Sequence, residues 1–153
     1  HNYHQLAVGK SNTGRGWVMV KAKALSPENL ITSLERGDFY SSSGVTLSGI
    51  RSDGKSLSFK IKPELGVTYS TTFIGTRKNF KSSPNLAKRN STKPSDAGIW
   101  EVLGQAQSLE PSYKFKGDEL YIRAEVVSSK KKVNPYAKGE YERAWLQPVL
   151  PAK

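Results

Sequence analysis

Cysteine is absent from the chain, and its absence excludes two kinds of structure. Without thiols the protein forms no disulfide framework and binds no metal through thiolates, and the redox state of its compartment is left open. No apolar run approaches the roughly 20 residues that span a bilayer. The opening residues also lack the basic, apolar, small-residue order of a signal peptide. We therefore predict a soluble chain with no membrane span, from which any export signal has already been removed.

Histidine is nearly absent as well, because the chain has only two, His1 and His4. A serine nucleophile needs a base within hydrogen-bond reach, and no histidine follows His4 to supply one. The glycine-rich patterns G-x-x-x-x-G-K-[ST] and G-x-G-x-x-G are missing too. Asp118 and Glu119 open a predicted strand, and we interpret them as turn residues rather than as a catalytic carboxylate pair. The residues thus predict no catalysis by this chain alone and reduce metal chemistry to the two histidines.

The two histidines are open to more than one interpretation. They can be polar residues of a frayed chain end. Alternatively, His1 can be a mature N-terminus that chelates copper through its amine and imidazole, as in the histidine brace of lytic polysaccharide monooxygenases. That copper site needs a second histidine from a distant segment, and no histidine follows His4. A copper oxidase is therefore only a remote alternative.

Acidic residues are few, since 13 Asp and Glu face 24 Lys and Arg and leave a formal net charge of +11. Between Glu64 and Asp96 the chain has six basic residues and no acid, within a Ser-, Asn- and Pro-rich run that predicts a long loop. The charge favours a polyanionic partner, whereas lysine-rich loops are more often solvated surface. The candidate polyanion-binding residues are Arg77, Lys78, Lys81, Lys88, Arg89, Lys130, Lys131 and Lys132.

One segment carries complete helix signals. Ser26 is a cap-forming residue, Pro27 occupies the first helical position, Glu28 lies near the positive end of the helix dipole, and Gly37 provides a stop. The predicted apolar face of this helix consists of Leu30, Ile31 and Leu34. Before the helix, the run WVMVKAKA predicts a strand over residues 17–24.

Short alternating runs separated by turn residues follow the helix. The runs VTLSGI and SLSFKIK flank the turn SDGK and predict a hairpin with Leu57, Phe59 and Ile61 on one face. ELYIRAEVVSS is a later strand whose alternation predicts Leu120, Ile122, Ala124 and Val126 on one face, opposite Tyr121, Arg123, Glu125 and Val127. We predict a mainly β protein, with an antiparallel, immunoglobulin-like β-sandwich over residues 44–153. The strand and helix within residues 1–43 are typical of an α/β unit and form a separate segment.

Several of these stretches resemble the closing part of metal-dependent phosphoesterases of the PHP (polymerase and histidinol phosphatase) superfamily. The run H-N-Y-H is followed by a glycine-led strand, a short helix and a G-x-F-Y-x-S-x-G passage. In this chain the passage consists of Gly37, Phe39, Tyr40, Ser41, Ser43 and Gly44. The late strand GDELYIRAEVVSS and the run AWLQPV resemble the β-sandwich into which larger bacterial members continue. The resemblance covers almost the whole chain.

The resemblance implies that residues 1–43 are the terminal strand and helix of a PHP-type (β/α)₇ barrel. It also implies that His1 is one metal ligand, whose partner ligands, an aspartate among them, lie upstream of residue 1. A parent protein of this kind uses divalent Zn, Mn or Fe, whereas we expect no cofactor in the 153-residue chain itself. The compartment is unknown, and a periplasmic or extracellular location suits such a parent.

Two functions are therefore considered for the sandwich. In the first, it is an accessory domain that packs on the missing barrel, and on a second subunit, through apolar faces left by Trp17, Phe39, Tyr40 and Trp145. In the second, it is a module that binds a polyanion or a carbohydrate through its basic loops or aromatic rings. We expect Trp17, Trp100 and Trp145 to pack in the core or in an interface, because β-forming or alternating residues flank each of them.

Overall fold

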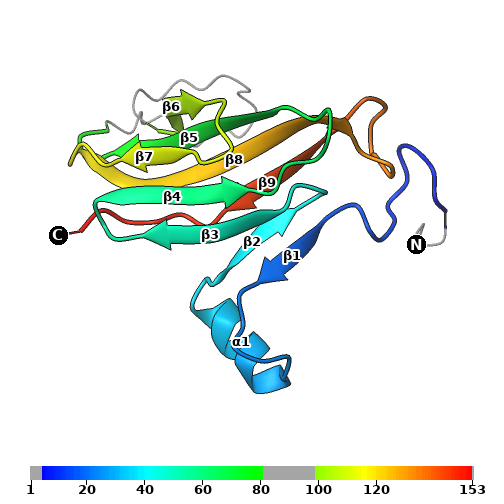
Figure 1. Cartoon of the computed structure of the whole chain (residues 1–153), viewed down its shortest axis with the longest axis horizontal. Coiled ribbons are helices and arrows are strands. Elements are labelled where there is room, and N and C mark those ends of the chain that lie inside the picture. Colours follow the sequence, from blue (N-terminus) through cyan, green and yellow to red (C-terminus); the bar gives the residue numbers. More distant parts are fainter. Residues whose placement is uncertain (1–4, 81–98, 153) are drawn as a thin grey trace, which may run out of the picture.

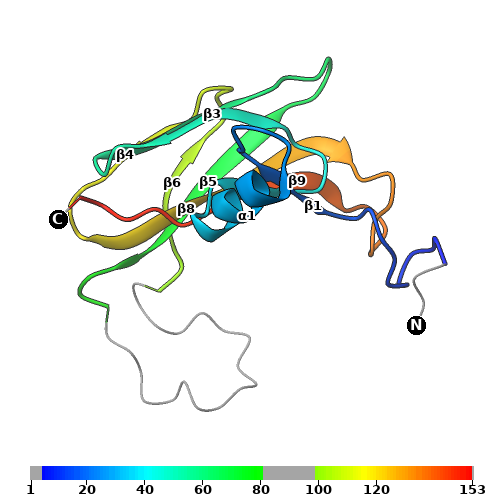
Figure 2. The ribbon, with the colours of Figure 1, turned by 90° about the horizontal axis from the view of Figure 1, so that it is seen from below.

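The computed structural model describes residues 5–80 and 99–152. These residues form two antiparallel sheets, one of six strands in the order β1-β2-β9-β8-β5-β6 and one of three in the order β3-β4-β7. The two sheets lie face to face with the core between them (Figure 1, Figure 2). The predicted mainly β fold and antiparallel sandwich are thus confirmed. The elements are β1 (Trp17–Val20), α1 (Pro27–Glu35), β2 (Phe39–Ser42), β3 (Leu47–Ser52), β4 (Ser56–Ile61), β5 (Tyr69–Arg77), β6 (Glu101–Ala106), β7 (Ser112–Lys114), β8 (Glu119–Lys131) and β9 (Tyr141–Leu146).

Helix α1 begins and ends where the sequence predicts. The Ser26 hydroxyl accepts a hydrogen bond from the Asn29 amide at 3.3 Å, and Gly37 follows the helix with a φ of 74°. The predicted apolar face does not pack on a core, because the side chains of Ile31 and Leu34 are exposed. The buried residue of α1 is Ser33, whose hydroxyl donates to the Lys21 carbonyl at 2.9 Å. Figure 1 shows the reason: α1 projects away from both sheets, beyond β1 and β2.

Strand β1 is shorter than predicted, since it ends at Val20 rather than at residue 24. After Val20 the Lys21 amide donates to the Asp38 carbonyl at 2.8 Å, and the chain then bends toward the cap of α1. Strand β1 pairs with β2, and β2 pairs with β9, so both strands belong to the six-stranded sheet. Residues 17–42 are therefore joined to the sandwich by main-chain hydrogen bonds, while their origin in a barrel stays a prediction.

The hairpin of β3 and β4 matches its sequence pattern. Leu57, Phe59 and Ile61 are buried on one face of β4. The turn is closed by Asp53, whose carboxylate accepts from the backbone amides of Lys55 and Ser56 at 2.9 and 2.7 Å. These hydrogen bonds lower the pKa of Asp53. Local turn chemistry and period-2 alternation thus suffice to specify this hairpin.

The core combines aromatic and aliphatic side chains from both sheets. The Phe73 ring lies 6.4 Å from that of Phe59 and 5.4 Å from that of Tyr113, measured between ring centroids. Tyr40, which was expected on an apolar docking face, is instead a core residue. Its hydroxyl accepts from the Leu47 amide at 2.8 Å and so ties β2 to β3. The core cluster also includes Val45, Leu57, Ile61, Tyr69, Ile122, Ala124, Val126, Ala144 and Leu146.

Strand β8 departs from its predicted alternation at its first residues. Thr76 pairs with Tyr121 whereas Arg77 pairs with Glu119, so the register skips Leu120. This irregularity leaves Leu120 exposed and places Glu119 in the interior, the reverse of what strict alternation predicts. From Ile122 onward the predicted faces are observed, with Ile122, Ala124 and Val126 buried.

Buried Glu119 is held by hydrogen bonds. Its carboxylate accepts from the Tyr113 hydroxyl at 2.7 Å and from the amides of Lys116 and Gly117 at 3.0 and 2.9 Å. Burial raises the pKa of Glu119, but these donors outweigh burial and lower its pKa below the ordinary value. Burial and the Glu119 carboxylate together raise the pKa of Tyr113. The carboxylate closes the Lys116–Gly117 turn, which agrees with its interpretation as a turn residue.

Candidate functional site

The candidate basic residues fall into two groups at opposite ends of β8. Arg77 ends β5 and pairs with Glu101 at 2.8 Å and with Asp118, both of which raise its pKa. The Lys78 ammonium donates to the Gly117 carbonyl at 2.8 Å. Strand β5 includes Arg77, which the sequence pattern predicted to lie in the basic loop. Arg77 belongs to a local network of ion pairs.

The second group lies where β8 ends. Lys130 contacts Glu64 at 2.7 Å and Glu142 at 3.4 Å, and the hydrogen bond that Lys130 donates to Glu64 raises the pKa of Lys130. Lys132 contacts Glu140 at 3.3 Å. Lys131 is exposed, and it has no ion pair with any residue in 5–80 or 99–152. Carboxylates thus accompany two of the three lysines.

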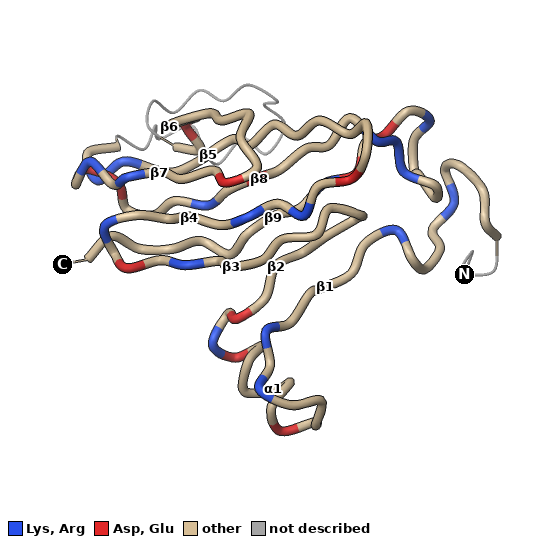
Figure 3. Tube along the Cα trace, viewed as in Figure 1, with Lys and Arg blue, Asp and Glu red and all other residues tan. Residues whose placement is uncertain are grey.

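The structure does not bring the two groups together. The 13 residues of β8 span about 40 Å at about 3.3 Å per residue. Figure 3 shows basic segments at both ends of the sandwich, with acidic segments among them. Lys81, Lys88, Arg89 and the candidate metal ligand His1 lie outside the described residues. Polyanion binding by the basic residues stays a prediction.

No group of three or more His, Cys, Asp and Glu side chains within residues 5–80 and 99–152 is arranged to hold a metal ion. No helix in the described part of the chain is long and apolar enough to cross a bilayer.

The segment that follows the histidines is anchored to the loop between β8 and β9. The Gly9 amide donates to the Tyr136 carbonyl at 2.8 Å, and the Asn134 side chain donates to Asn12 at 2.9 Å. The Arg15 guanidinium lies over the Tyr136 ring, 5.3 Å from its centroid. The segment around residues 9–15 is therefore placed beside the lysine-rich loop.

An exposed apolar surface extends over β1 and α1. It includes residues from both sides of the edge strand β1, from the turn before the helix and from the predicted helix face. We call it the β1–α1 face, and it consists of Trp17, Val18, Met19, Leu25, Ile31 and Leu34. Leu25 is 93% exposed and Ile31 56% exposed. Exposed apolar side chains that gather on neighbouring elements are typical of sites that another molecule or domain covers.

A groove of about 1130 Å³ lies next to this face. It runs between β3 and the segments 36–40 and 146–149, and Met19 of the β1–α1 face is among its lining residues. The groove thus adjoins the β1–α1 face at Met19 and extends from there along β3.

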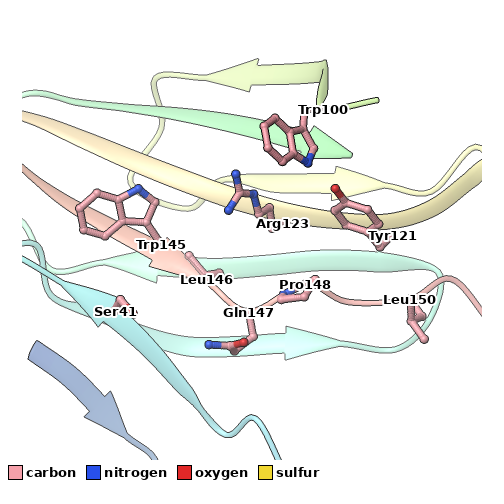
Figure 4. Close-up of a pocket in the computed structure, with 9 residues that line it drawn as sticks. All are labelled: Ser41, Trp100, Tyr121, Arg123, Trp145, Leu146, Gln147, Pro148 and Leu150. Atoms are coloured by element: carbon pink, nitrogen blue, oxygen red, sulfur yellow. The ribbon is translucent and has the colours of Figure 1, made fainter. Parts of the chain in front are cut away.

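A second hollow lies on the outer face of the six-stranded sheet, where Tyr121 and Arg123 of β8 and Trp145 of β9 project away from the core. Its volume is about 520 Å³, and we call it the aromatic cleft. In Figure 4 the Arg123 side chain lies between Trp145 and Tyr121, with Trp100 beyond them. Ser41, Gln147, Pro148 and Leu150 complete much of the lining.

Hydrogen bonds hold the rings of the aromatic cleft in place. The Trp145 indole donates to Glu125 at 3.1 Å, and the Arg143 guanidinium donates to the same carboxylate oxygen at 2.6 Å. On the other side, the Thr76 hydroxyl donates to the Tyr121 hydroxyl at 3.3 Å and accepts from the Trp100 amide at 3.5 Å. Arg77 pairs with Glu101 and Arg143 pairs with Glu125, whereas Arg123 has no ion pair within the described part of the chain.

Trp100 has an unusual backbone. Its φ is 53°, and it is the one non-glycine residue with positive φ in the ranges 5–80 and 99–152. The left-handed region costs a bulky residue about 1–2 kcal/mol. The side chain is nonetheless 70% exposed, so packing in the core does not compensate for this cost. Strained backbone of this kind is found preferentially at functional sites.

The structure places none of the three tryptophans in the core, so packing in an interface is the part of the prediction that stays open. Trp17 and Trp100 are exposed, and Trp145 is half-buried on the outer face of its sheet. The run of Tyr121, Arg123 and Glu125 on the outer side of β8 was the sequence signal for the cleft. That signal was incomplete, because β6, β8 and β9 come together only through the sheet order.

Comparisons with protein-family models, curated proteins and solved structures found no match for this chain.

Proposed function

We propose that this chain is a non-catalytic accessory β-sandwich of a PHP-like metal-dependent phosphoesterase, and that it docks on the metal-binding barrel through the β1–α1 face. One observation carries the proposal: the segment whose sequence resembles the end of such a barrel bears six exposed apolar side chains, on a strand and a helix that lie side by side and on the turn between them. A helix with clear start and stop signals but an uncovered apolar face is typical of an element with a packing partner elsewhere.

The energetics favour such a partner. Six apolar side chains of the β1–α1 face are exposed, and burial of a large one contributes about 1.5–3 kcal/mol. The adjoining groove extends the contact along the sandwich. In this proposal His1 and the upstream ligands would hold a divalent Zn, Mn or Fe ion in the parent, where the metal would polarise the phosphoester.

The first experiment tests catalysis. The 153-residue chain is incubated with Mn²⁺ or Zn²⁺ and p-nitrophenyl phosphate, and we expect no release of nitrophenol above the metal-only control. Turnover that depends on the chain would overturn the non-catalytic assignment.

The second experiment tests docking. The chain is expressed with its upstream genomic reading frame, and hydrogen exchange of residues 17–36 is compared with that of the 153-residue chain. We expect protection in the longer protein, and loss of it when Ile31 and Leu34 are both changed to Glu. Val133→Glu is the matched control, because Val133 is 94% exposed on the loop beyond β8. Equal exchange in the two proteins, or a reading frame with no metal-binding barrel, contradicts the proposal.

A further inference from the structure

We infer that the aromatic cleft is a binding site for a carboxylate-bearing saccharide, such as an oligosaccharide of uronic acids. The inference concerns the outer face of the six-stranded sheet and does not rest on docking through the β1–α1 face. The cleft has the volume of a small-ligand site, at about 520 Å³, within the usual range of about 300–1,000 Å³.

The rings of the cleft suit a pyranose. A sugar ring has an apolar face of C–H groups and an edge of hydroxyls, so it needs flat apolar surface beside hydrogen-bonding groups. Trp100, Tyr121 and Trp145 provide three rings, and Ser41 and Gln147 provide polar groups at the margin. Aromatic side chains with a polar atom at one end serve both needs at a low cost in side-chain entropy.

The charge of the cleft specifies the acidic group. The Arg123 guanidinium is a planar fork of N–H donors that matches a carboxylate. The neighbouring Arg77 and Arg143 are already paired with Glu101 and Glu125, so among the lining residues that the structure describes Arg123 is the cation left for the ligand. One guanidinium among rings fits isolated carboxylates on a sugar chain.

The same arrangement disfavours nucleic acid. A single strand carries a phosphate on every nucleotide, and proteins that bind it line the whole track with basic residues. Here Glu125 flanks Arg123 on the same face of β8, and the described lysine cluster Lys130–Lys132 lies at the far end of that strand. Within the described residues, an oligonucleotide in the cleft would therefore meet one guanidinium with the Glu125 carboxylate beside it.

The cleft is also prepared for a ligand before binding. Glu125 fixes the Trp145 indole, and Thr76 bridges Tyr121 and the Trp100 backbone. Sites held on strands lose little freedom when a ligand binds. Trp100 keeps its positive φ although its indole is exposed at the rim of the cleft. Packing of the indole in the core would offset more of the steric cost of this backbone conformation.

The experiment is calorimetric titration of the full chain with tetragalacturonate and with its methyl ester, which has the same sugar backbone and no charge. We expect the acid to bind at least about tenfold more tightly than the ester, as loss of one charge-assisted pair predicts. Arg123→Ala should remove this difference and leave ester binding within about twofold, and Arg123→Lys should restore it only in part because lysine lacks the fork.

Trp100→Ala separates the rings from the charge. It should weaken both ligands by about tenfold, the scale of one lost ring-stacking contact. Tyr141→Ala and Arg51→Ala remove an exposed ring and an exposed guanidinium elsewhere on the sandwich, and they should leave both affinities within about twofold. Near-ultraviolet circular dichroism of each variant establishes that the fold is retained.

Any of four results would overturn the inference. The first is absence of tetragalacturonate binding at ligand concentrations up to about 1 mM. The second is binding that survives Arg123→Ala and Trp100→Ala but is lost when Lys130, Lys131 and Lys132 are all changed to Ala. The third is tighter binding of an oligo-dT strand than of the acid, and the fourth is self-association of the chain that buries Trp100. None of these results bears on the hydrolase assay or on protection of residues 17–36, so the two proposals fail separately.

Discussion

The two faces of strand β8 have opposite characters although they alternate residue by residue. Ile122, Ala124 and Val126 face the second sheet and are almost completely buried. Tyr121, Arg123 and Glu125, one position away in each case, face outward and line or support the aromatic cleft. The inner face stabilises the fold through shape and apolar area, and the outer face presents groups that recognise other molecules. A shift of register by a single residue would exchange these roles, so the pairing of β8 specifies both at once.

The strongest test of this difference is Phe73→Ala on the inner face of β5. Phe73 is buried between the rings of Phe59 and Tyr113, so its removal should lower the free energy of unfolding by about 3–5 kcal/mol. The matched control is Ile74→Ala, at the next residue and on the opposite face, for which we expect about 1 kcal/mol. Urea denaturation measures both, and equal losses would contradict the division between the faces.

Gly75→Ala tests how closely the strands approach. A Cβ atom at this position would lie 2.4 Å from the Tyr121 carbonyl oxygen and 2.7 Å from Leu103. We expect a loss of about 3 kcal/mol, since the rigid backbone of β8 must move. Gly16→Ala is the control, because its nearest contact would be an ordinary 3.4 Å from the Ser42 carbonyl oxygen. A stability of Gly75→Ala close to that of the wild type would show that β5 and β8 can separate without cost.

Glu119→Gln tests the one carboxylate that the irregular register places in the interior. The variant should lose about 2 kcal/mol at neutral pH, because three donors then face a neutral amide. Since folding lowers the pKa of Glu119, its contribution is present above the unfolded value of about 4.5 and is lost as pH falls through the lower folded pKa.

Denaturation curves between pH 6 and pH 3 measure this effect. The wild type should lose more stability than Glu119→Gln over that range, which gives the variant the flatter profile. Exposed Glu110→Gln, which removes only a surface ion pair with Lys60, should follow the wild-type profile. Parallel profiles for the wild type and Glu119→Gln would contradict the assignment of this pH dependence to Glu119.

The smallest expected effect is at Trp100. Glycine adopts positive φ without the steric cost that alanine incurs, so Trp100→Gly should be more stable than Trp100→Ala by about 1 kcal/mol. Both variants should weaken saccharide binding equally, by about tenfold. A reversed order of thermal midpoints would mean that the backbone at this position is not strained.

Patterns confined to a few neighbouring residues were predicted from the sequence. Ser26 and Gly37 mark the ends of α1, Asp53 closes a hairpin, and the alternation in β4 identifies its buried face. Each of these depends on contacts between residues that are close in sequence. The antiparallel sandwich followed from such local signals taken together.

Features that depend on pairing between distant segments were missed. The register change at Leu120 depends on β5, and the cleft combines residues of β8 and β9 with Trp100, which directly precedes β6 and is far from both strands along the chain. The positive φ of Trp100 has no sequence signal, because glycine or asparagine would be expected at such a position. The tryptophans were predicted to pack in the core or in an interface from the β-forming or alternating residues around them, and such a pattern does not distinguish a core from an exposed cleft.

Strand β1 affects how readily the protein aggregates in solution. Within the described residues it pairs with β2 alone, so its other edge presents unpaired main-chain groups beside exposed Trp17 and Val18. The net charge of +11 repels one copy from the next. Salt shortens the range of that repulsion to about 8 Å at physiological ionic strength and about 3 Å at 1 M. We therefore expect the colloidal stability of the chain to depend on ionic strength. Concentrated salt, which protects many proteins from nonspecific adsorption, should favour edge-to-edge aggregation of this chain.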